Sequence, residues 1–599
     1  MKKLMSLVLA LLMVVSAFGF VMADEDEVWL PYDPETLQIK MDDRDASGKN
    51  GAVASSNWYA TKAGLDILKA GGNAFDAAIA TAYTLGVAEP FTSGLGGGGF
   101  MTLYDAKTGK VTVVDFREIA PAAATAEMWL VEGEEEKGTV KTFTRPDGFE
   151  FDPTRSYSKE SKVGGKAAGT PGEVAGLEYV LENFGSGTLT RQQLMQPAID
   201  LANEGYIITT TFKSSCEDEY FEMANMPECA ELYLDEVGLP LEIGTIKTNP
   251  KLANTLQLIA EGGKDAFYTG PVAEAIIETV QKYGGVMTLD DLANYKVEVR
   301  EPVMGTYRGY TIYSLPPASS GGTHLIQALN ILENFDMASI EVNSAEALHL
   351  WSETFKMCFA DRSKYMADTA FKEVPLKGLT SKEYAKQLAA KIDLTKSGTY
   401  EADDPYCFES TSTTSFHVID QWGNMVACTK TINDFFGSKV VIPEYGFIMN
   451  DEMDDFDKKP TATNCVEGGK RPLSSMSPSI VLYPDGKPFL TIGTPGGTRI
   501  WPTCTQVIQH MIDNGMNVQE AINASRIFDN SSDNINYEST GANQITPETI
   551  AALEAMGHKT TDKGGNNLYF GGVQGIEILP DGTIYGGADT RRDGKCLAY

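Results

Sequence analysis

Two adjacent threonines stand where an acidic, turn-rich segment meets a strand pattern. Residues 398–412 are dense in charge, Ser and Thr, and Thr413 and Thr414 open the apolar run that follows. A threonine hydroxyl is a weak nucleophile unless a base lies beside it, and a free α-amine on the same residue is one such base. A break between Ser412 and Thr413 would give Thr413 that amine. On these residues alone, an ordinary hairpin strand with a polar lead-in is the simpler interpretation.

The histidines argue against two other classes of hydrolase. They are His324, His349, His417, His510 and His558. None belongs to a Gly-x-Ser-x-Gly elbow or a His-x-x-Glu-His pattern, so a serine triad and a zinc hydrolase lack support. His417 follows Thr413 by four residues and therefore shares its strand face, where packing is the simpler role.

Two glycine clusters offer backbone N–H groups. Residues 94–99 lead into a strand, and without a following Lys-Ser/Thr they do not form a phosphate-binding loop. Residues 493–499 lie between a strand pattern and a helix pattern. Adjacent N–H groups near a helix start can stabilise a developing oxyanion. A tight connection that needs glycine explains the same residues equally well.

The elements that must position these groups alternate between helices and hairpins. Turn residues and apolar alternation predict hairpins over 101–116, 416–430, 479–491 and 576–585. Apolar spacing and capping residues predict helices over 62–71, 73–88, 170–183, 190–202 and 344–368. Residues 170–173 (TPGE) predict a capping box at the start of the third. Because strands and helices interleave throughout, we expect layers of sheet with helices outside.

Composition indicates a soluble globular protein with an ample core. The chain has 599 residues, of which 42% are hydrophobic and 22% charged. With 49 basic and 82 acidic residues the formal net charge is −33. Such a chain repels nucleic acid and anionic membrane surfaces, so neither is an expected partner.

The first residues have the layout of an export signal. Lys2 and Lys3 precede an apolar run over 4–22, and an acidic run follows Ala23. This pattern predicts a signal peptide over 1–23, cut after Ala23, with an uncleaved anchor as the alternative. We therefore expect the protein to be secreted, periplasmic or held at the cell surface, with no other membrane segment.

The eight cysteines form no CxxC pair, which gives a zinc site no support. Outside the cell, disulfides become possible. Cys216 and Cys229 lie close together in a Glu-rich stretch and are candidates for a small ring, with Cys407 and Cys465 as the next pair. For Cys358 and Cys504, which lie in helical patterns, free buried thiols are the alternative.

A series of short motifs runs in one order from about residue 50 to the C-terminus, and together they resemble the γ-glutamyltranspeptidases of the N-terminal nucleophile hydrolase superfamily. The motifs are 95–101 (LGGGGFM), 115–121 (DFREIAP), 307–310 (YRGY), 316–322 (PPASSGG), 360–362 (ADR), 413–414 (TT), 431–433 (TIN) with 436–437 (FG), 450–456 (NDEMDDF), 471–478 (RPLSSMSP) and 494–499 (TPGGTR). Each motif is weak alone, and the ordered set is specific.

The resemblance implies an α/β (α+β) fold, a four-layer αββα sandwich, and a precursor that cuts itself before Thr413. The large subunit would then be 24–412 and the small catalytic subunit 413–599, forming a heterodimer. The resemblance implies no cofactor and no metal. Its site residues carry over as the nucleophile Thr413, its hydroxyl partner Thr431 and the oxyanion pair Gly496 and Gly497.

The resemblance also assigns an amino-acid head-group site. Its residues match Arg117, Ser474 and Ser475 for the α-carboxylate, and Asn433, Glu452 and Asp455 for the α-amine. The chemistry agrees, because arginine binds a carboxylate through two parallel hydrogen bonds and paired carboxylates suit an ammonium. The alternatives are a scaffold ion pair for Arg117, a turn for the two serines and a solvated acidic loop for the two carboxylates.

Two departures from the family pattern bear on substrate choice. Ser415 stands where many relatives carry a histidine, two residues after the nucleophile. The connection from Phe456 to Arg471 is short, whereas several relatives have a longer loop that covers the pocket. A short connection predicts an open site that admits γ-linked glutamate polymers as well as glutathione.

The function that this resemblance implies is a γ-glutamyltransferase and glutathione hydrolase. It would pass a γ-glutamyl group from a small-molecule donor to water or to an amino acid. Alternatives within the class are a poly-γ-glutamate depolymerase and an acylase for glutaryl-type amides. A non-catalytic exported amino-acid-binding protein is the alternative from a different class, and self-cleavage separates it from an enzyme.

Overall fold

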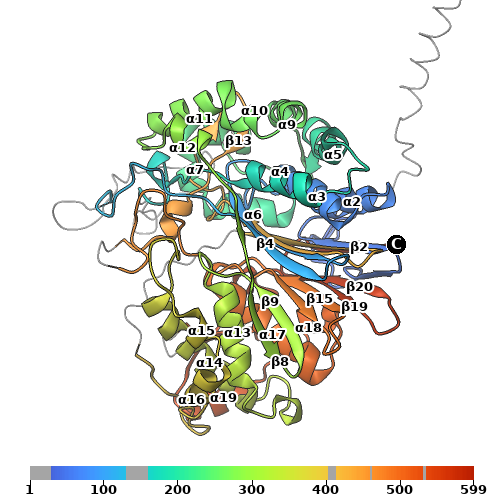
Figure 1. Cartoon of the computed structure of the whole chain (residues 1–599), viewed down its shortest axis with the longest axis vertical. Coiled ribbons are helices and arrows are strands. Elements are labelled where there is room, and N and C mark those ends of the chain that lie inside the picture. Colours follow the sequence, from blue (N-terminus) through green and yellow to red (C-terminus); the bar gives the residue numbers. More distant parts are fainter. Residues whose placement is uncertain (1–27, 130–159, 402–412, 459–461, 531–533) are drawn as a thin grey trace, which may run out of the picture.

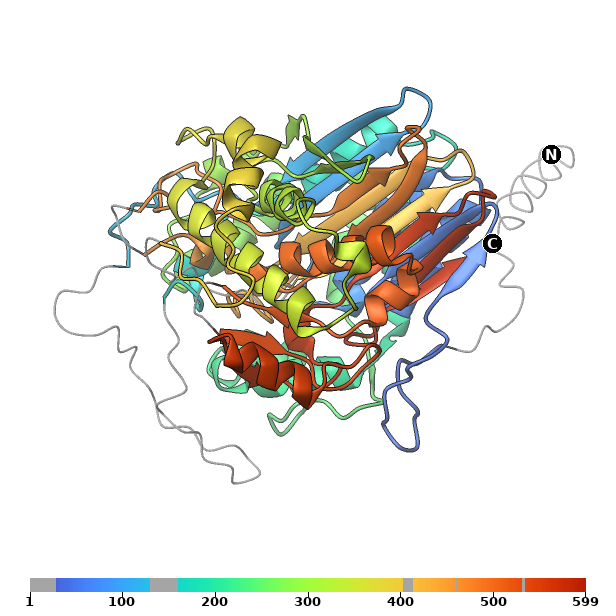
Figure 2. The ribbon, with the colours of Figure 1, turned by 90° about the horizontal axis from the view of Figure 1, so that it is seen from below.

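The computed structural model of the protein describes residues 28–129, 160–401, 413–458, 462–530 and 534–599. Two seven-stranded sheets lie face to face, with helices on both outer sides (Figures 1 and 2). This confirms the predicted four-layer αββα sandwich. The expected signal peptide and Ser412, the residue before the expected cut, lie outside the described residues.

The first sheet carries the hairpin that follows Thr413 at its centre. Its order is β21-β2-β10-β11-β3-β4-β7, and every neighbouring pair is antiparallel. The strands are β2 (Gly51–Ser55), β3 (Gly98–Asp105), β4 (Lys110–Phe116), β7 (Glu298–Arg300), β10 (Thr414–Asp420), β11 (Met425–Thr431) and β21 (Lys595–Ala598). Strands from the N-terminal half thus flank β10 and β11 on both sides.

The second sheet has the order β1-β20-β19-β15-β14-β9-β8. Its strands are β1 (Ala46–Gly48), β8 (Val303–Tyr307), β9 (Tyr310–Ser314), β14 (Ser479–Leu482), β15 (Pro488–Gly493), β19 (Gln574–Ile578) and β20 (Ile584–Ala588). The four predicted hairpins are all present, as β3–β4, β10–β11, β14–β15 and β19–β20.

Alternation along β10 divides the core into layers. Phe416 and Val418 belong to the apolar cluster beneath the helices, whereas Ile419 belongs to the layer between the two sheets. This follows from the two-residue period of a strand. His417 is fully buried, its ring contacts the Ser415 hydroxyl at 3.1 Å, and burial lowers its pKa to about 3. It is therefore a neutral packing residue.

Helices cover the outer face of each sheet (Figure 1). Those on the first sheet's side include α2 (Trp58–Lys69), α3 (Ala74–Ala88), α4 (Glu173–Phe184) and α5 (Arg191–Glu204), and those on the other side include α13 (Gly321–Leu332), α14 (Ala345–Tyr365) and α17 (Ile500–Asn514). The five predicted helices correspond to α2, α3, α4, α5 and α14. Within the described ranges, no helix combines the length and apolarity needed to cross a bilayer.

The predicted capping box at the start of α4 is wrong. Thr170 forms a β-bridge instead, and the N–H groups of Gly172 and Glu173 both donate to the Gly97 carbonyl. The helix therefore begins at Glu173, without a side-chain cap. Local sequence suggested a cap, but long-range pairing with the glycine-rich segment satisfies these backbone groups.

The predicted ring between Cys216 and Cys229 is also wrong. Both are buried free thiols, and they lie on two helices, α6 (Thr210–Asp218) and α8 (Pro227–Tyr233), rather than in a loop. Burial raises the pKa of both thiols. Cys358 and Cys504 are free and buried as well. Cys465 is likewise free and buried, so its candidate pairing with Cys407, which lies outside the described residues, is not formed.

A buried ion pair joins the first sheet to its helical layer, and it gives a stability prediction. Lys430 Nζ lies 2.6 Å from Glu173 Oε1, and both side chains are fully buried. Lys430→Met leaves that carboxylate without its partner and should lower the free energy of unfolding by about 3–5 kcal/mol. Lys487→Met, which breaks an exposed pair with Asp485, is the matched control and should leave the denaturant midpoint unchanged. Equal midpoints for the two variants would contradict the assignment.

Candidate active site

The pairing of β10 with β11 places two threonines opposite each other at the end of the first sheet. Thr414 lies opposite Lys430, so Thr413 and Thr431 come next to one another at the strand ends. Their hydroxyl oxygens are 3.4 Å apart, and both residues are almost fully buried. The predicted nucleophile and its predicted hydroxyl partner are therefore in contact.

Buried hydrogen bonds fix the positions of both threonines. The N–H of Asn433 donates to the Thr431 hydroxyl oxygen over 2.8 Å. Thr414, the residue after the predicted nucleophile, donates its hydroxyl to Glu89 Oε2 over 2.9 Å, and Ser56 donates to the same oxygen over 2.7 Å. Buried hydrogen bonds of this kind fix the start of β10 and hence the position of Thr413.

The glycine segment after β15 supplies one wall of the site. Gly496 and Gly497 have φ angles of +133° and +57°, which L side chains rarely adopt. Gly497 lies in the pocket lining beside Thr413, and the segment continues into α17. Gly496 precedes it and packs against Gly571, whose Cα would lie 3.4 Å from an added Cβ.

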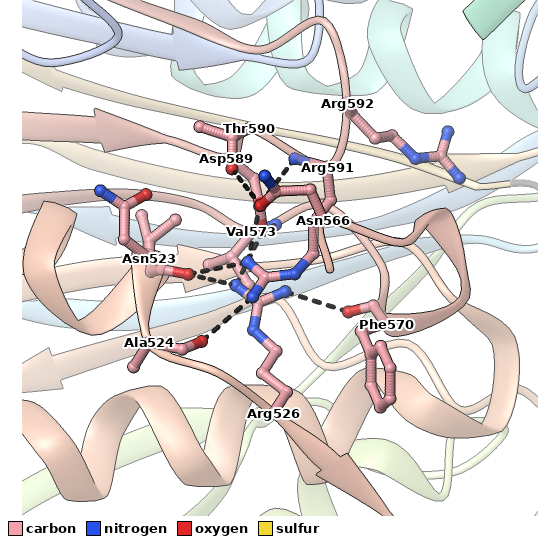
Figure 3. A network of polar contacts seen from close by, with 12 residues as sticks. Asn523, Ala524, Arg526, Asn566, Phe570, Val573, Asp589, Thr590, Arg591 and Arg592 are labelled. Carbon is pink, nitrogen blue, oxygen red and sulfur yellow. Dashed lines mark hydrogen bonds and ion pairs between the residues drawn. The ribbon is translucent and has the colours of Figure 1, made fainter. Parts of the chain in front are cut away.

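A buried charge network stiffens the loop that contacts Gly496 (Figure 3). Arg526 donates to the Phe570 carbonyl over 3.0 Å and to Asp589 over 2.7 Å. Asp589 in turn accepts from the N–H of Val573 over 2.8 Å. Arginine and aspartate therefore clamp the backbone on both sides of Gly571.

The predicted head-group residues come from four separate parts of the chain, at 117, 433, 452–455 and 474–475. Arg117 directly follows β4, and Glu452 and Asp455 lie on the short 3₁₀ helix η3 (Glu452–Asp455). The Arg117 guanidinium pairs with Glu452 and, over 2.5 Å, with Asp455. The two sides predicted to bind opposite charges of a ligand thus bind each other in the ligand-free protein.

Burial dominates the electrostatics of this cluster. It raises the pKa of Glu452 and of Asp455, against the opposing attraction of Arg117. Burial alone would lower the Arg117 pKa, but the surrounding carboxylates raise it. Burial also raises the pKa of neighbouring Glu118 to about 8, and neither of its carboxyl oxygens has a hydrogen-bond partner among the described residues. Burial therefore favours the uncharged form of Glu118.

One pocket gathers nine of the ten predicted site residues, all except Gly496. They are Arg117, Thr413, Thr431, Asn433, Glu452, Asp455, Ser474, Ser475 and Gly497. The lining also includes Arg362, Leu473, Met476, Thr498 and Ile500, which were not predicted as site residues. Arg362 was signalled by the motif 360–362, although no role followed from that motif alone.

A second cluster of titratable groups lies within the second helical layer. Ligand-type atoms of His349, Glu353 and His558 lie within 4.8 Å of one another. The two imidazoles share a 2.7 Å hydrogen bond, and the Lys356 ammonium lies 2.8 Å from Glu353. Lys356 also donates to the Gly398 carbonyl over 3.0 Å. Because a protein cation already neutralises the carboxylate, we assign this cluster to holding the segment around Gly398.

Comparisons with known proteins agree with the fold. The family model described as "Gamma-glutamyltranspeptidase" matches residues 60–599. The chain is 42% identical to the "Glutathione hydrolase proenzyme" of Escherichia coli (strain K12), covering 91% of this chain and 90% of that one. It is 39% identical to the protein of the same description from Bacillus subtilis (strain 168), covering 92% of each. Among solved structures, the cephalosporin acylase from Bacillus halodurans superimposes with a TM-score of 0.81 at 28% identity, covering 95% of this chain and 99% of that chain.

The four-layer fold with a threonine at the head of a central strand defines an N-terminal nucleophile hydrolase. The chain belongs, within that class, to the γ-glutamyltranspeptidase family.

The buried cluster predicts a pH-dependent loss of stability in Arg117→Met. Without the guanidinium, Glu452 and Asp455 keep protons in the folded state that the unfolded chain releases above its ordinary carboxyl pKa of 3.8 to 4.5. Stability relative to the parent protein should therefore fall as the pH rises, reaching a deficit of about 3 kcal/mol. Denaturant midpoints from about pH 5 to about pH 8 measure this.

The control is Arg117→Met combined with Glu452→Gln, which removes one of the stranded carboxyls. This double variant should recover part of the stability at high pH. A deficit that is independent of pH would show that Arg117 stabilises the fold through packing rather than charge.

Proposed function

We propose that the protein cleaves γ-glutamyl amides such as glutathione and passes the γ-glutamyl group to water or to an amino acid. The observation that carries this proposal is the pocket itself. A threonine at the head of a central strand shares it with an arginine and two carboxylates, which are the groups that recognise an amino-acid head. The family membership supports the same reaction.

The first step of the proposed mechanism is maturation. Cleavage between Ser412 and Thr413 frees the Thr413 α-amine, which then accepts the proton of its own hydroxyl. The Thr413 oxygen attacks the γ-carbonyl carbon, and N–H groups of the Gly496–Gly497 segment stabilise the oxyanion. The C–N bond breaks, the amine leaves with the proton, and a γ-glutamyl ester forms on Thr413. Water or an amino acid then attacks the ester carbonyl and restores the hydroxyl.

The head-group cluster gives the proposed specificity. The α-carboxylate of the substrate takes hydrogen bonds from Arg117, Ser474 and Ser475, and its α-ammonium lies against Asn433, Glu452 and Asp455. Because Arg117 pairs with both carboxylates in this structure, a head group that replaces those contacts must supply both charges. A head group with only one charge leaves one side of the cluster without a partner.

The buried carboxylates and the threonine pair also bear on the alternative functions. The similarity to a cephalosporin acylase keeps a glutaryl-type acylase under consideration, but the two buried carboxylates favour a substrate that carries an ammonium. A non-catalytic amino-acid-binding protein has no need of two threonine hydroxyls at 3.4 Å in the same pocket. Cleavage of γ-linked glutamate polymers stays a prediction, because residues 459–461 of the short connection lie outside the described residues.

Maturation also fixes the proposed subunits. We assign 1–23 to a signal peptide that directs export, 24–412 to the large subunit and 413–599 to the small one. The β10–β11 hairpin of the proposed small subunit lies between β2 and β3 of the proposed large subunit. The two products of the cut would therefore share one sheet and remain associated.

Self-cleavage is the first test. The purified protein should give two bands on a denaturing gel, and N-terminal sequencing of the smaller should begin at Thr413. Thr413→Ala should remain one uncut, inactive chain, because it lacks the hydroxyl that both steps need. Thr414→Ser, which keeps a hydroxyl at the neighbouring position, is the control and should still be cut. A different N-terminus on the small fragment would overturn the assignment of Thr413.

Matched substrates test the head group. We expect kcat/KM for a γ-glutamyl anilide to exceed that for the glutaryl anilide, which lacks only the α-amine, by at least about 100-fold. Asp455→Asn removes one acceptor charge and should narrow this ratio, mainly by weakening γ-glutamyl turnover. Comparable kcat/KM values for the two anilides in the parent enzyme would move the protein to the acylases.

A further inference from the structure

Two motifs from the first half of the chain have no role in the reaction as described so far. They are residues 316–322, which lead into α13, and residues 360–362 near the end of α14. In the structure both motifs meet the Ser474–Ser475 loop, which forms part of the pocket wall. A shared contact with the proposed carboxylate site indicates that the two motifs act on that site.

The first motif holds the backbone of the serine loop. Ser474 and Ala318 are joined by an N–H···O bond of 2.9 Å, and the N–H of Ser320 donates to the Ser474 carbonyl over 2.9 Å. The approach is so close that a Cβ on Gly321 would lie 2.3 Å from the carbonyl oxygens of Ser475 and Met476. Glycine is therefore required at 321, and the loop has little freedom to shift.

Arg362 holds the side chains. Its Nε donates to the Ser320 hydroxyl over 2.9 Å, and its Nη2 donates to the Ser475 hydroxyl over 3.1 Å. The Ser320 hydroxyl in turn donates a hydrogen bond to the Ser474 carbonyl over 2.8 Å. Because a guanidinium only donates, the Ser475 oxygen must accept from Arg362.

Each of the two pocket serines therefore still has a hydroxyl hydrogen that it can donate to a ligand. The Ser474 oxygen accepts from the N–H of Met476 over 3.1 Å, as the Ser475 oxygen does from Arg362. Within the described part of the chain, no acceptor is recorded for either O–H, and both residues line the pocket with Arg117. An anion placed there would receive both protons.

We infer that Arg362 is a positioning residue for carboxylate recognition. It orients the Ser475 hydroxyl through a direct hydrogen bond and the Ser474 backbone through Ser320, so that both serines donate to the α-carboxylate of the substrate. This inference rests on the proposed function and names the part of the chain that enforces its carboxylate requirement. Arg362 acts through the serines and does not itself take the substrate.

The test compares a γ-glutamyl anilide with the 4-aminobutyryl anilide, which lacks only the α-carboxylate. Arg362→Lys keeps the charge, but a lysine ammonium does not have the planar pair of donors with which Arg362 binds Ser320 and Ser475 at once. We expect the variant to raise KM for the γ-glutamyl anilide by about tenfold with little change in kcat. KM for the 4-aminobutyryl anilide should not change. The control Arg191→Lys alters an arginine that pairs with Glu178 and should change neither.

A double-mutant cycle with Ser475→Ala separates the two ways in which Arg362 could act. If Arg362 works through Ser475, adding Arg362→Lys to Ser475→Ala should raise KM by less than about twofold. A full effect in the Ser475→Ala background would show that Arg362 contacts the substrate directly, and an equal rise in KM for both anilides would show a purely structural role. Either result, or no change at all, overturns the inference.

Two further measurements keep the inference separable from the proposed function. Ser320→Ala retains the charge of Arg362 and should raise KM for the γ-glutamyl anilide by about threefold, even if Arg362→Lys fails to fold. Calorimetric binding of L-glutamate and 4-aminobutyrate gives the same comparison without turnover. Loss of that discrimination in Arg362→Lys supports the inference, and retention contradicts it. An inactive parent enzyme would contradict only the proposed function.

Discussion

The antiparallel pairing of β10 with β11 is the constraint on which the site depends. Both strands are buried on both faces and lie in the middle of the first sheet, between β2 and β3. A shift of one residue would turn Phe416 and Val418 away from the helices and bring polar groups into their place. The register is therefore fixed, and it sets Thr413 beside Thr431. The proposed nucleophile gains its position from packing that extends far beyond the pocket.

Burial then decides the electrostatics of the pocket. Arg117 and Arg362 supply two positive charges, and Glu452 and Asp455 offer two carboxylates. Burial raises the pKa of neighbouring Glu118 as well, which favours its uncharged form. A pocket balanced in this way accepts a zwitterion without a change in net charge, whereas a simple anion or cation would add an uncompensated charge to a buried site.

The sequence predicted the sheets and helices well because the signals for hairpins and helices are local. Turn residues and alternation located all four hairpins, and the ordered motifs led to the fold and to nine residues that share the pocket. Long-range pairing accounts for what was missed. Thr170 has the pattern of a cap but pairs with Ile119. Arg362 and Ser475 are 113 positions apart, and no local pattern indicates that they meet. An ion pair was the alternative role of Arg117, but the sequence did not identify Glu452 and Asp455 as its partners.

That mutual pairing links specificity to stability. An isolated arginine or carboxylate at this depth would carry a desolvation cost of several kcal/mol, so the ligand-free protein needs internal partners for both signs of charge. The carboxylate of a zwitterionic head group can replace Glu452 and Asp455 as partner of Arg117, and its ammonium can replace Arg117 as partner of those carboxylates. The serines held by Arg362 and Ser320 then add neutral hydrogen-bond donors on the carboxylate side only. In the proposed function, the charged cluster selects for both charges together, and the serine loop determines at which end of the pocket the carboxylate lies. Orientation relative to Thr413 follows from the loop, because charge balance alone is the same for a head group bound in either direction.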